Sequence, residues 1–365
     1  SKGPSFVEGD KVLAKTSKIS TNFYSATVLR RLDNTKTRIL GIIKPGDDKL
    51  RVVPVSGRRS EEAVIDTNGS KELKDGDLVE VEIQQTRSFG HKSAKVINVL
   101  SHENDQNLIS LISINEFDIP TEFTPEAISL AEQAQPVKIS KGREDLRDIN
   151  LITVDGDDAR DFDDAIWAEK DKNPHNLNGW RMIVAIADVA HYVSNGDPLD
   201  IDARKRGNSV YFADRVVPML PENLSNGLCS LKPNEDRGCL AVEITIDKFG
   251  HKKSHRFIRG VMRSKARLTY EQLEETFNGN KNACSPEIMK LAKSLRGAYN
   301  ALSDAREKRG ALNIETVEKV IKINENGKID SILPRERLES HKVIEEFMVT
   351  ANVCAAETLE EKMHT

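Results

Sequence analysis

An apolar, β-branched run that leads into an aspartate-rich loop constrains this chain more than any other feature. The run Leu151 to Val154 predicts a buried strand, and Asp155-Gly156 ends it with a sharp turn. The ten residues from Asp155 to Asp164 include six aspartates. Crowded carboxylates raise one another's pKa values, so the loop alone should cost stability at neutral pH. Divalent cations would reverse that cost.

A pair of Mg²⁺ ions is the metal site that this loop suggests. Mg²⁺ prefers oxygen ligands, and two ions about 3.5–4 Å apart activate water and stabilise the leaving oxygen in phosphoryl chemistry. A calcium EF-hand needs Gly at position six and Glu at position twelve, but counting from Asp155 places Arg160 and Ile166 there. A solvated acidic loop remains the alternative, because charge runs are usually solvated.

Composition indicates a water-soluble protein of two or three domains. The 365 residues are 38% hydrophobic and 31% charged, with a net charge of -4 at pH 7. No run approaches the roughly 18 apolar residues of a membrane span, and the polar start is unlike a signal peptide. Four cysteines without CxxC spacing predict reduced, buried, structural thiols in a cytoplasmic protein: Cys229, Cys239, Cys284 and Cys354.

The charge is distributed unevenly along the chain. Residues 1–60 carry 13 Lys and Arg against 5 Asp and Glu, a balance of +8, which leaves about -12 for residues 61–365. A basic segment in front of an acidic body suits a polyanion that is held at one end and cleaved by metals at the other. Basic segments are also often only solvated surface.

An imperfect repeat with a period near 67 residues organises the first hundred residues. Gly9 to Leu13 with Ala26 to Leu29 recurs as Gly76 to Glu80 with Ala94 to Ile97. Further strand-like runs before the second copy complete about five short strands, as in an OB-type barrel that binds oligonucleotides. These runs are Arg38–Lys44, Leu50–Val55 and Glu61–Asp66. The first copy has only closing strands, so we expect the chain to start inside a domain.

The remaining pattern mixes helices and strands. Thr124-Pro125 predicts a short helix to about Ala134, and Ser285-Pro286 predicts a long one closed by Gly310. A last helix should begin near Ser340, with Glu345 and Glu346 at its amino end, where the helix dipole favours negative charge. A continuous apolar run predicts a strand at Met182–Ala187, and two further strands are expected at Cys239–Ile246 and His255–Met262, joined by a turn around Gly250.

At this point the residues resemble the ribonuclease II/ribonuclease R exoribonucleases, and most closely the ribonuclease R branch. The carboxylates Asp155, Asp161, Asp163 and Asp164, with the strand end at Asp188, are similar to that catalytic domain. Further ordered matches are Ser209–Phe212, Val217–Pro221, Leu224–Leu231, Ala266–Tyr270, Arg309–Leu312 and Ile344–Met348. The resemblance covers most of the chain.

The resemblance implies both a domain plan and an activity. We expect part of a first OB/cold-shock barrel at 1–34, a second at 35–110, a connector at 111–149 and a partial α+β ribonuclease II-type catalytic domain at 150–365. The implied activity is hydrolytic, processive 3′→5′ degradation of RNA to nucleoside 5′-monophosphates with Mg²⁺ or Mn²⁺. The expected partner is the 3′ end of single-stranded RNA, bound by a monomer.

Site roles also follow from the resemblance. Asp155 and Asp164 would bind the tighter metal, while Asp161 and Asp163 would complete a second site and hold the attacking water. Tyr211 matches a tyrosine that stacks on the terminal base, and Tyr270 one whose hydroxyl approaches the scissile phosphate. Glu345 matches an active-site glutamate. Each lone tyrosine could instead be a half-buried core ring, and Glu345 a helix cap.

Two departures qualify the resemblance. The second stacking position, often Phe, falls at Ile314, and no Ser-Pro-Ile-Arg segment with its transition-state arginine occurs. We therefore expect a chain truncated at both ends. A non-catalytic RNA-binding protein of the same fold is the alternative function, and DNA as substrate also stays open, because only contacts to the 2′-OH distinguish RNA.

Overall fold

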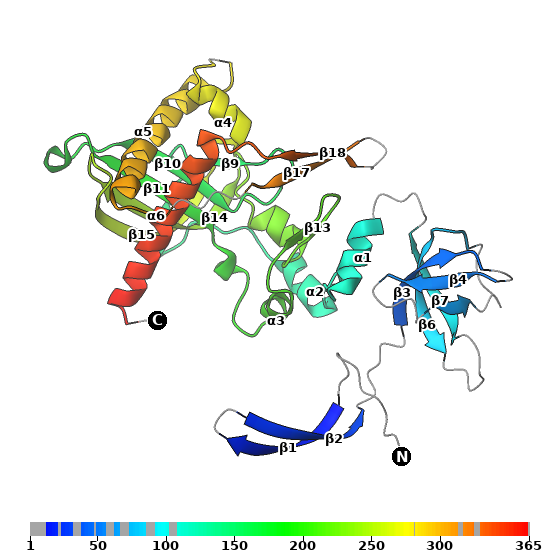
Figure 1. The fold of residues 1–365 in the computed structure, drawn as a ribbon. Helices are drawn as coiled ribbons and strands as arrows, with labels where there is room; N and C mark the ends of the chain where they lie inside the picture. Colours follow the sequence, from blue (N-terminus) through cyan, green and yellow to red (C-terminus); the bar gives the residue numbers. More distant parts are fainter. Residues whose placement is uncertain are drawn as a thin grey trace. The chain divides into compact units, whose positions relative to one another are not determined.

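A computed structural model describes two compact units, which are treated separately (Figure 1). Up to Ile119, with two short later segments, the residues belong to the first unit, and the second contains most of the chain from Pro120 onward. Within the described residues, no helix is long and apolar enough to cross a membrane. The described ranges are 12–20, 23–31, 38–46, 49–55, 62–65, 73–84, 92–101, 108–280, 282–312, 317–324 and 329–363.

A closed five-stranded barrel forms the centre of the first unit. Its strands join in the order β3-β4-β5-β7-β6, and their inward residues form one apolar cluster around Ile43, Ile65 and Val81. The OB-type barrel predicted from the sequence is therefore present. The strands are β3 (Arg38–Lys44), β4 (Arg51–Pro54), β5 (Ala63–Ile65), β6 (Leu78–Gln84) and β7 (Lys92–Ser101).

Two further elements of this unit flank the barrel in sequence. Strands β1 (Val12–Ser20) and β2 (Phe23–Arg31) form an antiparallel pair ahead of it, and helix α1 (Leu108–Glu116) follows it. The start of the sequence repeat, Gly9 to Lys11, lies outside the described residues. The domain boundaries expected at residues 34, 110 and 149 stay predictions.

The second unit is built on a seven-stranded sheet with the order β16-β9-β10-β11-β14-β15-β8. Its pairs are antiparallel except the two at the edges, where β16 runs parallel to β9 and β8 parallel to β15. The strands are β8 (Glu144–Asp145), β9 (Ile152–Asp155), β10 (Asp164–Lys170), β11 (Trp180–Ala187), β14 (Asp236–Ile246), β15 (Lys252–Arg263) and β16 (Ala266–Thr269).

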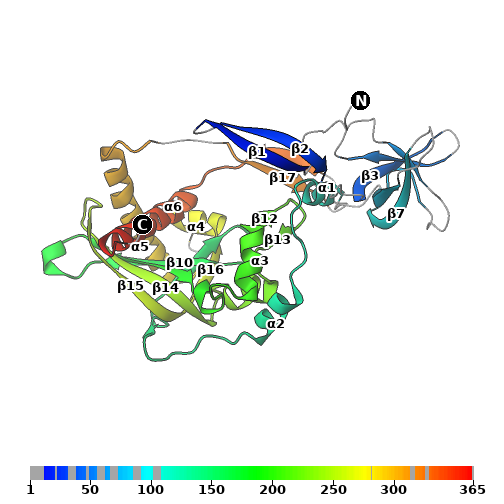
Figure 2. The ribbon, with the colours of Figure 1, turned by 90° about the horizontal axis from the view of Figure 1, so that it is seen from below.

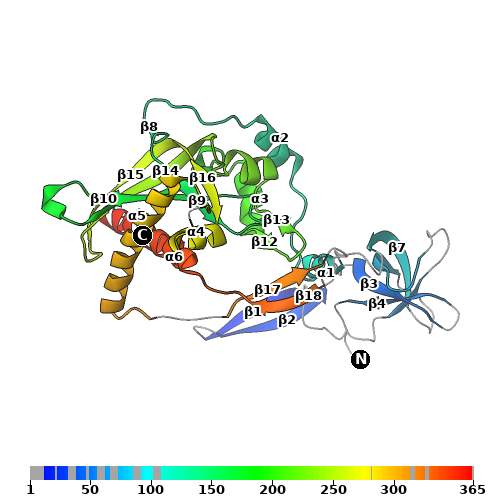
Figure 3. The same ribbon diagram turned by 90° about the horizontal axis from the view of Figure 1, so that it is seen from above.

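Helices cover both faces of this sheet, because successive strand residues face opposite sides. Along β11, Met182 and Val184 join one core with helices α4 (Tyr270–Phe277), α5 (Pro286–Lys308) and α6 (Glu339–Glu361). The alternate residues Ile183 and Ala185 join the other core. That second core includes residues of α2 (Pro125–Gln133), α3 (Pro198–Arg206) and the π-helical turn Leu224–Leu228. The views from below and above show α4, α5 and α6 together (Figures 2 and 3).

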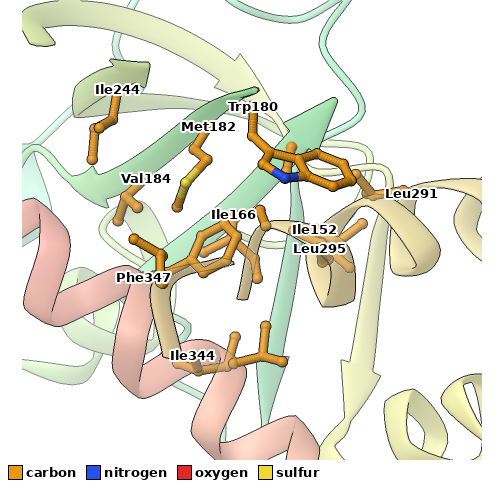
Figure 4. Close-up of a cluster of buried hydrophobic side chains, with 14 of the residues drawn as sticks. Ile152, Ile166, Trp180, Met182, Val184, Ile244, Leu291, Leu295, Ile344 and Phe347 are labelled. Carbon is orange, nitrogen blue, oxygen red and sulfur yellow. The ribbon is translucent and has the colours of Figure 1, made fainter. Parts of the chain in front are cut away.

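The core under α5 and α6 depends on a close helix-to-sheet approach (Figure 4). Trp180 is buried there, with Ile166 and Phe347 in the same cluster. A Cβ built at Gly297 on α5 would lie 2.3 Å from the Trp180 ring, so only glycine fits at this contact. The helix therefore packs its backbone directly on the indole.

The elements predicted from the sequence are confirmed within one to three residues at most ends. Thr124 caps α2 through its hydroxyl, which accepts from the backbone N–H of Ala127, and Ser285 caps α5 in the same way. Two short two-stranded sheets are also present, β12 (Val210–Tyr211) with β13 (Val216–Val217), and β17 (Lys319–Ile323) with β18 (Ile329–Pro334).

The four cysteines are free thiols in the structure. Cys229, Cys239 and Cys354 are buried, whereas Cys284 is only half-buried, so the prediction of burial was wrong for that one. Cys284 lies just before the α5 cap, and its sulfur is within hydrogen-bond distance of the Thr276 hydroxyl.

Candidate functional site

The aspartate loop connects two adjacent strands of the central sheet. Asp155 is the last residue of β9 and Asp164 the first residue of β10. These strands are antiparallel neighbours, with Ile166 opposite Ile152, so the end of one lies beside the start of the other. The fold thus brings two carboxylates that are nine positions apart to one end of the strand pair.

Hydrogen bonds to the main chain hold the returning arm of the loop, which is the part from Arg160 to Asp163 that leads into β10. The Ser230 hydroxyl donates to the Arg160 carbonyl at 2.9 Å and accepts from the Phe162 N–H at 3.1 Å. Leu231 N–H donates to the Phe162 carbonyl, and Ala187 N–H to that of Asp163. Asp161 and Asp163 therefore flank a residue, Phe162, whose main chain is fixed on both sides.

Burial and mutual repulsion raise the pKa values of three aspartates. Burial, followed by the charges of Asp164, Asp161 and Asp163, raises the pKa of Asp155 to about 7. Asp163 is partly exposed to solvent. Burial of the remainder of its side chain, followed by the charge of Asp161, raises the pKa of Asp163 to about 6. Burial and Asp163 raise the pKa of Asp164 to about 6. The four predicted carboxylates thus share one electrostatic environment.

The chemistry of this donor set fits divalent cations. Asp155 Oδ2 is buried and has no hydrogen-bond partner, and an orphaned buried carboxylate oxygen is costly unless a cation or a proton meets it. In the described part of the chain, however, no group of three or more His, Cys, Asp or Glu side chains is arranged to hold a metal ion. The carboxylates share a region without converging on one point.

Tyr270 reaches the same end of the sheet through the parallel edge pair. Strand β16 runs beside β9 with Thr269 opposite Asp155, and Tyr270 is the next residue. Thr269 caps α4, with its hydroxyl accepting from Gln272 N–H, so the chain turns there into the helix. Burial and the charges of Asp155 and Asp164 raise the pKa of Tyr270 to about 12. Its phenol is therefore a protonated donor at neutral pH.

Tyr211 is bonded directly to the aspartate loop. Its hydroxyl donates to Asp161 Oδ2 at 2.7 Å, and partial burial with the charges of Asp161 and Asp163 raises its pKa to about 12. The side chain is nevertheless 63% exposed. An exposed ring anchored by its hydroxyl can serve as a stacking platform.

Glu345 lies away from these contacts, on α6. It forms ion pairs with Arg337 and with Arg306, the latter at 3.6 Å, and its neighbour Glu346 also pairs with Arg306. These side chains line a cavity of about 380 Å³ with Tyr299. No described contact joins Glu345 to the aspartates. Ile314, the other predicted contact to RNA, lies outside the described residues.

Asp188, at the end of β11, belongs to an ion-pair cluster. It is 6% exposed and accepts from Arg143 at 2.7 Å and from Arg259 at 2.7 and 3.1 Å. These two arginines hold the pKa of Asp188 below its usual range, against the effect of burial. Asp188 therefore ties the segment before β8 to β15, and it has no described bond to the aspartate loop.

Sequence reasoning missed two side chains at this site. Arg267 of β16 donates to the carbonyls of Gly156 and Asp157, and His341 of α6 stacks on Tyr270. Arg267 stands three positions before Tyr270 in the matched segment Ala266–Tyr270, so its place in that motif was the signal that could have drawn attention to it. His341 is 71 positions from Tyr270, and nothing local in the sequence links them.

The fold and site together define a class, in which a cold-shock-type barrel precedes an α+β nuclease-type domain with a carboxylate loop. The comparisons agree with this description. The model of the RNB domain matches residues 143–365, and that of the cold shock domain matches residues 52–124. The RNB match covers more than half of the chain, and the chain belongs to the RNB-domain family.

Curated relatives include ribonuclease R from several bacteria. Over 97% of this chain, the sequence is 39% identical to ribonuclease R of Vibrio parahaemolyticus. Over 85% of this chain, it is 38% identical to ribonuclease R of Escherichia coli. It covers 43% and 38% of those two proteins. The chain thus spans less than half the length of these relatives.

Solved structures show the same fold. The apo form of Mycoplasma genitalium RNase R matches with a TM-score of 0.81 at 25% identity, covering 97% of this chain and 56% of that one. Yeast Ssd1, described as a pseudonuclease, matches with a TM-score of 0.60 at 16% identity over 97% of this chain and 45% of that one. The fold therefore also occurs in a protein described as a pseudonuclease, so activity must be argued from the site.

Proposed function

We propose that the protein is a hydrolytic, processive 3′→5′ exoribonuclease that releases nucleoside 5′-monophosphates. The observation that carries this proposal is the set of crowded aspartates with raised pKa values beside two tyrosines. Such a loop is unfavourable without cations and suits two-metal hydrolysis of a phosphodiester. Membership of the RNB-domain family, with ribonuclease R among the relatives, supports the same reaction.

The four aspartates have distinct roles in this proposal. Asp155 and Asp164, at adjacent strand ends, bind one Mg²⁺ or Mn²⁺, and Asp161 and Asp163 bind the second. Divalent cations lower the pKa of an attacking water and stabilise the leaving oxygen. Asp163, the more exposed carboxylate of the second pair, orients that water. The orphaned Oδ2 of Asp155 supports its assignment as a ligand.

The tyrosines position the RNA. The protonated Tyr270 hydroxyl can donate to an oxygen of the scissile phosphate, because its pKa lies near 12. Tyr211, exposed and anchored to Asp161, stacks on the terminal base, and Ile314, at the second stacking position of the resemblance, is an apolar contact to the RNA. Stacking tolerates any base and contributes about 1–3 kcal/mol per base, as non-specific degradation requires.

Glu345 contacts the RNA end in this proposal. Its ion pairs with Arg306 and Arg337 leave it in a cavity of about 380 Å³, which offers room for a sugar or phosphate. The substrate is a single-stranded 3′ end, and the protein acts as a monomer in the cytoplasm, which its free thiols suit.

A non-catalytic RNA-binding protein is the second candidate. The observation that favours it is the absence of a three-ligand metal arrangement in the described residues, together with the likeness in fold to Ssd1. The presence of all four aspartates favours the nuclease.

One experiment decides between these functions. The complete natural protein that contains this chain, the chain itself and Asp163→Asn in both are incubated with 5′-labelled single-stranded RNA or DNA in Mg²⁺ or Mn²⁺. A ladder shortening from the 3′ end on RNA, absent in the variant while RNA binding persists, supports the nuclease. RNA retention that survives EDTA, with no nucleotide released by any form, supports the binding protein.

A further inference from the structure

Arg267, which was not among the predicted site residues, contacts the aspartate loop at two places. One is the outgoing arm, just after Asp155, and the other is the returning arm around Phe162. Arg267 lies on β16, opposite Thr153 of β9. Its Nη2 donates to the Gly156 carbonyl and, at 3.0 Å, to the Asp157 carbonyl, the first two carbonyls after Asp155. The same guanidinium lies 5.5 Å from the centre of the Phe162 ring.

The contact with Phe162 joins the outgoing arm of the loop to the returning arm. Phe162 stands between Asp161 and Asp163, and its main chain is fixed by Ser230 and Leu231. Arg267 therefore spans from the carbonyls that follow one proposed ligand to the ring between two others.

Arg267 achieves this without bonding to any proposed ligand. Among the described residues its ion pair is with Asp157, at 3.8 Å, and no hydrogen bond or ion pair joins it to Asp155, Asp161 or the Asp163-Asp164 pair. The side chain is largely buried, with 21% exposed. Its charge also offsets part of the repulsion around Asp155. A cation that directly paired with the ligands would compete with metal, whereas this one leaves their oxygens available.

We propose that Arg267 is a positioning residue for divalent cations, which sets the separation of the two arms of the aspartate loop and thereby the affinity for Mg²⁺. This inference rests on the proposed function. Outer residues that are hydrogen-bonded to metal ligands typically change metal affinity 10–100-fold when they are replaced, and Arg267 acts one step further out, through the main chain of the loop.

The test measures Mg²⁺ binding directly and needs no RNA hydrolysis. Mg²⁺ is titrated into the metal-free chain at pH 8, and the dissociation constant is obtained from the shift in melting temperature and by calorimetry. Arg267→Met keeps an apolar stem over Phe162 but removes the donors and the charge, and Arg267→Lys keeps the charge with a shorter reach. Arg256→Met is the matched control, because Arg256 pairs with Glu144 and Glu243 elsewhere on the sheet.

We expect Arg267→Met to weaken Mg²⁺ binding at least 10-fold, Arg267→Lys to weaken it less, and Arg256→Met to leave it unchanged. A wild-type dissociation constant in both Arg267 variants would overturn the inference while leaving the metal site intact. If Arg267→Met does not fold, the comparison of Arg267→Lys with Arg256→Met decides. A wild-type chain that binds neither Mg²⁺ nor Mn²⁺ would overturn the proposed metal site itself, and this inference with it.

Discussion

The ring of Tyr270 lies flat against the ring of His341, with the centroids 4.0 Å apart and 17° between the planes. His341 is itself fixed, because its Nδ1 accepts from the backbone N–H of Leu338 at 3.2 Å at the start of α6. Burial and the charge of Arg335 lower its pKa, so the imidazole stays neutral at pH 7. The stack therefore joins the first residue of α4 to the first turn of α6.

This stack predicts a separable contribution to stability. His341→Gln keeps a side chain that can cap Leu338 but loses the stack, and His341→Phe keeps the stack but loses the cap. A stacked aromatic pair contributes about 0.5–1.5 kcal/mol beyond its area, so we expect His341→Gln, which keeps the cap, to lower the free energy of unfolding by about 1 kcal/mol. Urea unfolding measures it. Equal stability of His341→Gln and wild type would contradict the prediction.

The aspartate loop predicts an unusual pH dependence in EDTA. The pKa of Asp155 is about 7 in the folded chain and near 3.8 when unfolded, so the folded state binds the extra proton between these values. Stability should therefore fall as pH rises from about 4 to 7, opposite to the usual carboxylate behaviour. Asp163 and Asp164, with pKa values of about 6, add to the fall.

The test is the variant Asp155→Asn in EDTA. We expect it to raise the free energy of unfolding at pH 8 by on the order of 1 kcal/mol, and to change it little at pH 4, where the native carboxyl is already neutral. Guanidinium unfolding at both pH values measures this. Saturating Mg²⁺ should reverse the order at pH 8, because wild type binds the ion and the variant binds it poorly. A variant that is destabilised at pH 8 in EDTA would contradict the pKa assignment.

Tyr211 predicts a difference between losing a ring and losing a hydroxyl. Tyr211→Ala removes the exposed stacking face and should weaken binding of single-stranded RNA by about 1–3 kcal/mol, or roughly 5- to 150-fold. Tyr211→Phe loses the bond to Asp161 but keeps the face, so its affinity should stay within about threefold of wild type. Fluorescence anisotropy in EDTA measures both. Equal losses in the two variants would assign the effect to the Asp161 bond instead.

The Asp188 cluster predicts a large structural cost. Asp188→Asn leaves the guanidinium of Arg143 buried without its counter-charge, and breaking a buried pair typically costs about 3–5 kcal/mol. Arg259 is 47% exposed, so Arg259→Met should cost about 1 kcal/mol. Chemical unfolding at pH 7 compares the two. A loss for Asp188→Asn no larger than that for Arg259→Met would contradict the assignment.

Sequence patterns predicted the elements well because their signals are local. The cap at Thr124 and the apolar run Met182–Ala187 each lie within a few residues, and helix α2 and strand β11 formed where expected. The carboxylate loop was equally local, since its aspartates fall within ten positions of one another. The structure places these carboxylates in one electrostatic environment; their roles as ligands stay predictions.

The remaining features depend on contacts between distant segments. The register of β16 beside β9 brings Arg267 to the loop, and the packing of α6 on α4 brings His341 to Tyr270. Neither pairing has a pattern within one segment. The ion pairs of Glu345 with Arg306 and Arg337 also come from tertiary packing, so its helix position alone could not reveal them.

The edge pairing of β16 with β9 also determines when the site around the aspartate loop can be assembled during synthesis. Ile152 pairs with Ala266, and the four other central strands lie between them in sequence. A ribosome must therefore release more than a hundred residues after the aspartate-bearing strand before Arg267 and Tyr270 can reach it. Until then the nascent chain carries the carboxylates without Arg267 and Tyr270 beside them. The site around the aspartate loop is therefore one of the last parts of the sheet to form.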